Sequence, residues 1–91
     1  MKLQYQYIHF ELIESGKRIT SIWSCHNNKS RDELGVVRWY PAWRAYCYFP
    51  SDPAVYSAGC LHDIEQFISD AMKQHRLDVQ HRHAEPARID P

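Results

Sequence analysis

Aromatic and cationic side chains gather in one stretch of this chain, residues 34–50, which reads LGVVRWYPAWRAYCYFP. It holds two of the three Trp and three of the six Tyr, with two Arg among them. Such groups form hot spots in protein interfaces. They also stack on bases and pair with phosphates in single-stranded nucleic acid. The stretch therefore predicts a binding site made by Arg38, Trp39, Tyr40, Trp43, Arg44, Tyr46 and Tyr48.

Within this set, we expect Trp39, Trp43, Arg44 and Tyr48 to make the main contacts. A purely structural role stays open for the same residues. Rings of this size can pack a small sheet, and Arg side chains can cover them.

Two close pairs of soft metal ligands, Cys25-His26 and Cys60-x-His62, raise the question of a zinc site. Neighbouring residues in a strand point to opposite faces, so Cys25 and His26 are poorly placed to bind one ion. A thiol at a helix N-terminus can be reactive, which makes a small Cys-dependent enzyme a third alternative. Because free Cys is commonly a buried core residue, we expect no metal, no cofactor and no enzyme.

Composition limits the class of protein. Acidic and basic residues balance at 11 each, which argues against a strongly basic nucleic-acid binder. Three Cys, an odd number, argue against a disulfide framework and favour reduced thiols. The start, MKLQYQYIHF, lacks the apolar segment of a signal peptide, and no run approaches 18 apolar residues. We therefore expect a cytoplasmic protein that does not enter a membrane.

Four strands are predicted to position the aromatic stretch. Alternating apolar and polar residues predict strands over residues 4–14 and 19–26, joined by a turn over 14–17 in which Gly16 takes a positive φ. Two more follow over residues 34–39 and 44–49, with a Pro-containing turn between them. In the fourth strand we expect Ala45, Cys47 and Phe49 to face the core. Residues 54–57 form a short fifth strand or an extended approach to a helix.

A helix is predicted from about Gly59 to Arg76, with Ser57 or Gly59 in its cap region. Its apolar stripe contains Leu61, Ile64, Ile68, Ala71 and Met72, with Phe67 at the margin. The pattern then decays, which predicts a compact domain over residues 1–76 and a polar tail over 77–91, mobile or lying on the surface. The fold class is α+β: an antiparallel meander of four or five strands, followed by one C-terminal helix packed on one face.

Residues 32–67 carry a resemblance. The pattern LGxxxWYxxWRxYxxFP, followed by CLxDIxxF, resembles that of a family of small proteins of bacteriophages, prophages and other mobile elements. The chain departs from the family at Ala42 and at Ala45, where a polar residue is expected. The resemblance implies a small protein that binds and blocks a host factor. The matching positions are Leu34, Gly35, Trp39, Tyr40, Trp43, Arg44, Tyr46, Phe49, Pro50, Cys60, Leu61, Asp63, Ile64 and Phe67.

The leading functional hypothesis is a non-enzymatic phage or prophage binding protein. Its partner would be a host or phage protein, such as a host defence nuclease. The alternative is a single-stranded nucleic-acid binder, because a meander followed by a helix is also the topology of Whirly-type domains, a fold-level analogy only. A sheet with one face lacking a helix often pairs with a second copy, so we also expect a homodimer.

Overall fold

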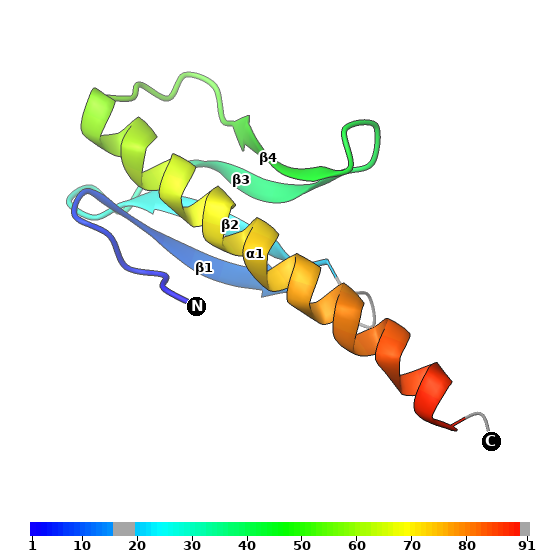
Figure 1. Cartoon of the computed structure of the whole chain (residues 1–91). Coiled ribbons are helices and arrows are strands. Elements are labelled where there is room, and N and C mark those ends of the chain that lie inside the picture. The colour runs from blue at the N-terminus through cyan, green and yellow to red at the C-terminus, as the bar shows by residue number, and fades with distance from the viewer. Residues whose placement is uncertain (16–19, 90–91) are drawn as a thin grey trace.

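The computed structural model describes the backbone of residues 1–15 and 20–89, and side chains as far as residue 81. Four antiparallel strands form a sheet in the order β1-β2-β3-β4, and one helix, α1, crosses a single face of it (Figure 1). The predicted α+β meander with one C-terminal helix is confirmed. The elements are β1 (Ile8–Glu14), β2 (Ile22–Asn27), β3 (Glu33–Tyr40), β4 (Ala45–Pro50) and α1 (Ala58–Ile89).

The contact between helix and sheet centres on Phe67, whose side chain is completely buried. Its ring stacks on Phe10 of β1, with centroids 3.8 Å apart, and meets Trp23 of β2 edge-on at 5.1 Å. The buried stripe of α1 is Cys60, Ile64, Phe67 and Ala71, so Phe67 is central and not marginal.

The prediction for Leu61 is wrong, because it is 54% exposed. The apolar residues of α1 fit two overlapping stripes at helical spacing. The stripe that contains the large Phe67 ring buries more apolar surface and faces the sheet.

Ser57 is the N-cap of α1, which resolves the choice between Ser57 and Gly59. The Cys60 N–H donates to Ser57 Oγ at 3.2 Å, and the Leu61 N–H donates to the Ser57 carbonyl at 3.0 Å. The bond to Oγ satisfies a backbone donor that has no partner inside the helix, and the bond to the carbonyl is the first regular hydrogen bond of α1.

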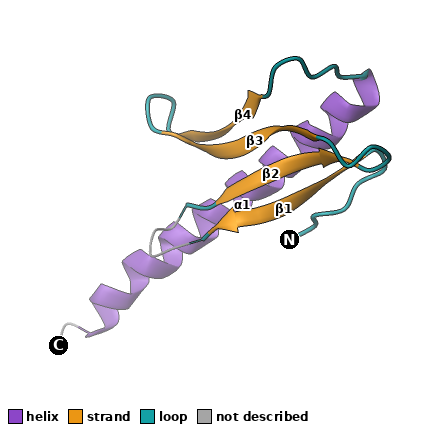
Figure 2. Cartoon of the chain, turned by 180° about the vertical axis from the view of Figure 1, so that it is seen from behind, coloured by secondary structure: helices purple, strands orange, loops and turns teal. Residues whose placement is uncertain are grey.

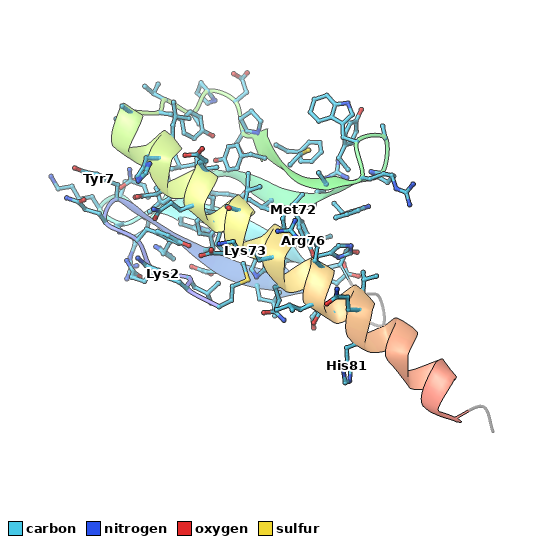
Figure 3. All side chains as sticks on the ribbon, in the orientation of Figure 1. Lys2, Tyr7, Met72, Lys73, Arg76 and His81 are labelled. Atoms are coloured by element: carbon cyan, nitrogen blue, oxygen red, sulfur yellow. The ribbon has the colours of Figure 1, made fainter. Side chains whose placement is uncertain are left out.

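The predicted helix end at Arg76 is wrong, because α1 continues to Ile89. The sequence after Arg76 contains no Gly, and its first Pro is Pro86, so nothing local stops the helix earlier. A helix of 32 residues is about 48 Å long, whereas a strand of eight residues spans about 26 Å. The helix therefore extends past the sheet (Figure 1) in a molecule of 55 × 24 × 20 Å. His81 lies on this projecting part and points away from the sheet (Figure 3).

The first strand begins at Ile8, four residues later than predicted. The chain reverses just before it: the Tyr5 N–H donates to the Ile8 carbonyl at 2.9 Å, and the Phe10 N–H donates to the Leu3 carbonyl at 2.8 Å. This reversal explains the change of alternation near Tyr7 and brings Tyr5 into the core.

Two further predictions concern the turn between the first two strands and a possible fifth strand. The predicted turn over residues 14–17, with Gly16, lies partly outside the described residues. Residues 54–57 form no strand, so the sheet has four strands in the described part of the chain.

The predicted core face of β4 is wrong. Tyr46 is 5% exposed and belongs to the core, whereas Cys47 and Phe49 lie on the side away from α1. The reason is the register with β3, in which Tyr46 pairs with Trp39 and Tyr48 pairs with Val37. Alternation along a strand defines two sets of side chains, but only the neighbouring strand decides which set meets the helix.

Gly35 lies directly under the Tyr48 ring. A Cβ atom at position 35 would be 2.5 Å from Tyr48 Oη and 2.6 Å from the Phe49 carbonyl oxygen. The Tyr48 hydroxyl donates to Tyr56 Oη at 2.8 Å, and the Tyr56 hydroxyl in turn donates to the Leu34 carbonyl. A Gly inside a strand often marks a close approach of this kind.

Gly35→Ala is expected to lower the free energy of unfolding by about 1–3 kcal/mol, because the added methyl group meets a fixed backbone oxygen and a hydrogen-bonded ring. Urea unfolding followed by Trp fluorescence measures the change. A midpoint equal to that of the wild type would show that Tyr48 does not confine this position.

Candidate functional site at the hairpin tip

The seven residues predicted to bind a partner lie on different sides of the sheet. Trp39, Tyr46 and Tyr48 face α1. The Ser21 N–H donates to Tyr46 Oη at 3.0 Å, and Trp39 packs against Tyr46 and against the His75 ring, whose centroid is 4.3 Å away. These three rings build the layer between the sheet and α1, as the structural alternative left open by the sequence predicts, and Tyr46 belongs to the core.

The other four predicted residues lie away from α1. We call residues 40–44, which connect β3 to β4, the hairpin tip. The Trp43 side chain is 72% exposed, and Tyr40 meets its ring edge-on with centroids 5.1 Å apart. Two backbone hydrogen bonds hold the turn. The Trp43 N–H donates to the Tyr40 carbonyl at 3.1 Å, and the Arg44 N–H donates to the Pro41 carbonyl at 3.2 Å. An exposed indole is thus held on an ordered turn.

Arg38 extends the tip surface onto the sheet. Its guanidinium carbon lies 3.9 Å from the centroid of the Phe49 ring, within the range of a cation–π contact. The Phe49 ring also lies 6.0 Å from Tyr40. The Tyr40 and Phe49 rings and the Arg38 guanidinium therefore form one surface that runs from the tip toward the C-terminal end of β4.

Arg44 has a backbone φ of +51°, in the left-handed region that favours Gly and Asn. For a residue with a Cβ atom, this conformation costs about 1–2 kcal/mol of conformational free energy. Backbone strain of this kind concentrates at functional positions, where the side chain matters more than local stability.

A polar cluster on the β1–β2 half of the same face was not predicted. The His9 and His26 rings stack with centroids 5.3 Å apart, and Glu11 Oε2 lies 3.0 Å from His9 Nε2. Ser24 Oγ lies 2.8 Å from His26 Nε2, but Ser24 is only 5% exposed, so its hydroxyl is not accessible to a substrate as a nucleophile. Only the pairing of His9 with His26 across β1 and β2 reveals this cluster, and a single sequence does not give that register.

The two Cys-His pairs do not form a shared site. Cys25 is fully buried on the α1 side of β2, whereas His26 stacks on His9 on the opposite side. The His62 side chain is 64% exposed, and its Nδ1 lies 3.9 Å from Glu65 Oε1. Within residues 1–15 and 20–81, no three His, Cys, Asp or Glu side chains are arranged to hold a metal ion.

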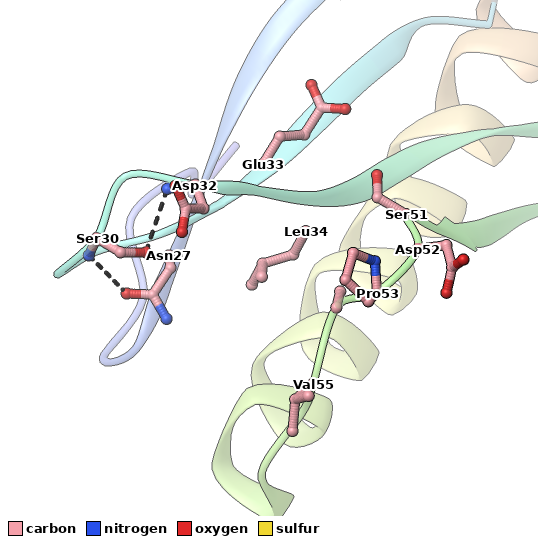
Figure 4. Close-up of a pocket in the computed structure, with 10 residues that line it drawn as sticks. Asn27, Ser30, Asp32, Glu33, Leu34, Ser51, Asp52, Pro53 and Val55 are labelled. Carbon is pink, nitrogen blue, oxygen red and sulfur yellow. Dashed lines mark hydrogen bonds between the residues drawn. The ribbon is translucent and has the colours of Figure 1, made fainter.

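A hollow of about 520 Å³ lies between the β2–β3 loop and the segment after β4 (Figure 4). Asp32, Glu33 and Asp52 are among its lining residues. Hydrogen bonds between side chains and backbone order the β2–β3 loop. Asn27 Oδ1 accepts the Ser30 N–H at 3.0 Å, and Ser30 Oγ accepts the Asp32 N–H at 3.2 Å. Asp32 lies in the β2–β3 loop, Glu33 begins β3 and Asp52 follows β4, and their carboxylates do not converge on a common point (Figure 4).

Comparison with models of known protein families, with curated proteins and with solved structures found no match. The functional assignment therefore rests on the geometry of the site. In the part of the chain that the structure describes, no helix has an apolar segment long enough to cross a membrane.

Cys25 is expected to react slowly. Burial raises the pKa of its thiol to about 12, so the reactive thiolate is scarce near neutral pH. With the reference pKa of 9.0, alkylation at pH 7.5 should be about a thousandfold slower than for a free thiol. Mass spectrometry after iodoacetamide treatment measures the rate, and the half-buried Cys47 is the internal control. Rapid modification of Cys25 in the native protein would contradict this prediction. The Cys-dependent enzyme depends instead on Cys60, the thiol at the helix N-terminus, and slow modification of all three Cys would argue against it.

Proposed function

We propose that this chain is a non-enzymatic binding protein that holds a partner protein at the hairpin tip. Trp43 carries the proposal: a large aromatic side chain is 72% exposed at the end of an ordered hairpin. Trp, Tyr and Arg are the residue types enriched in interface hot spots. In the tip, Trp43 stands beside Tyr40 and Arg44, and the cost of the backbone conformation at Arg44 favours a role for that side chain.

Charge favours a protein over nucleic acid as the partner. The chain carries no net charge, and two carboxylates lie elsewhere on the same face as Arg38: Glu11 on β1 and Glu33 at the start of β3. A phosphate backbone laid across this face would meet both signs of charge. A protein surface can match such a mixture group by group.

The resemblance to small phage and prophage proteins supports a more specific form of the proposal. In that form, the chain acts in the host cytoplasm, and the tip engages a host or phage protein. A host defence nuclease is the example that the resemblance favours.

Trp43→Ala is expected to weaken partner binding by roughly 2 kcal/mol, the size of a hot-spot truncation. Capture from bacterial lysate by immobilised protein, quantified for each retained partner, measures the loss. Leu61→Ala is the matched control, because Leu61 is 54% exposed but lies on α1. If Trp43→Ala retains every partner as well as the control does, the tip is not the interface.

Arg44→Asn is expected to separate stability from binding. Asn tolerates a positive φ, so this variant should gain roughly 0.5 kcal/mol in the free energy of unfolding. Loss of the guanidinium group should weaken capture of the same partners. Urea unfolding and lysate capture measure the two effects. A less stable variant, or one with unchanged capture, would contradict the role given to Arg44.

The nucleic-acid alternative is tested separately with mixed single-stranded oligonucleotides at low salt. Binding that weakens steeply as salt rises would show contacts to phosphates. That result, combined with unchanged lysate capture by Trp43→Ala, would replace the protein-partner proposal.

A further inference from the structure

The face of the sheet opposite α1, which we call the open face, is covered by no helix in the described part of the chain (Figure 2). One row of residues crosses it through all four strands: Glu11 pairs with Ser24, Ser24 with Val36, and Val36 with Phe49. On β3 and β4 the row is apolar. Val36 and the Phe49 ring, over which the Arg38 guanidinium lies, make this row apolar on the β3–β4 half of the open face.

Opposite charges flank this apolar row on the same strand. Arg38 lies two residues beyond Val36, toward the hairpin tip, and pairs with Cys47. On the other side, a bulge in β3 shifts the register so that Glu33 pairs with His26. His26 belongs to the open face, so Glu33 lies there too, and Figure 4 shows Glu33 and Leu34 on opposite sides of β3. Arg38 and Glu33 thus lie on the open face on either side of Val36.

This arrangement is complementary to itself. We propose that a second copy of the chain packs on the open face, about a two-fold axis that follows the row through Val36. Such an axis exchanges the two ends of β3, so Arg38 of each copy meets Glu33 of the other. The apolar part of the row meets its own counterpart at the axis. An interface of this kind uses the same surface on both copies, as two-fold dimers do.

Two further groups lie at the ends of this interface. Glu11 is the β1 end of the row and would approach its own counterpart at the rim. The Glu11 carboxylate already contacts His9 within the single chain, with Glu11 Oε2 3.0 Å from His9 Nε2. Trp43 lies beyond the strands in the hairpin tip, at the rim of the proposed interface.

Both edges of the sheet are partly covered, which favours a dimer that packs face to face over one that joins two sheets edge to edge. Residues 3 and 4 cover part of β1, through the Phe10 N–H bond to the Leu3 carbonyl and the bridge between Gln4 and His9. At β4, the Tyr46 N–H donates to Met72 Sδ at 3.3 Å, and Met72 projects from α1 toward the sheet (Figure 3). A second copy therefore finds the face more accessible than the edges.

A charge-swap experiment tests the dimer. Sedimentation equilibrium of the full chain should show association with increasing concentration, from 10.8 kDa toward twice that mass. Arg38→Glu alone and Glu33→Arg alone place like charges across the axis and should each raise the dissociation constant about tenfold or more. The double variant restores opposite charges and should recover association to within about threefold of the wild type. Lys73→Glu, an exposed reversal on α1, is the matched control and should leave association unchanged.

Three results would overturn the proposal: a wild-type chain that stays monomeric, single variants that associate like the wild type, or a double variant that stays as weak as the singles. Arg38 and Glu33 are both exposed in the single chain, so their substitution should leave the fold intact, which circular dichroism verifies. The experiment needs no other protein, so its outcome is independent of the partner proposed for the tip.

Discussion

The packing of one ring, Phe67, determines much of this structure. It joins α1 to β1 and β2 by stacking on Phe10 and meeting Trp23 edge-on. A chain of this length buries a limited core, so one fully enclosed aromatic side chain is a large share of its apolar stabilisation. The position of this ring also sets the rotation of the helix. That rotation turns Cys60, Ile64 and Ala71 toward the sheet together with Phe67.

Much of the fold could be predicted from the sequence because it depends on local patterns. Alternation of apolar and polar residues predicted the strands, and helical spacing predicted α1. The errors came from contacts between distant segments. The core face of β4 depends on its register with β3, and the buried stripe of α1 depends on which ring the sheet accepts. The chain reversal at Tyr5 depends on Leu3 bonding to Phe10, which no alternation pattern contains.

The candidate site was predictable in composition and less so in geometry. The sequence identified the stretch that carries Trp43 and Arg44 because Trp, Tyr and Arg are concentrated there. It did not separate these residues from Trp39, Tyr46 and Tyr48, since both groups have the same chemistry. Burial makes the distinction: one group supports the hairpin from the α1 side, and the other remains in contact with solvent.

The covering of the sheet edges has a consequence for how this protein can change. Where a partner adds a strand to a sheet, main-chain hydrogen bonds supply much of the affinity, and these are largely independent of side-chain identity. Here the Tyr46 N–H of β4 donates to Met72 Sδ, and residues 3 and 4 lie along β1. Recognition is then left to side chains on the face and at the tip. Single substitutions there can alter the choice of partner while Phe67 and its neighbours maintain the fold.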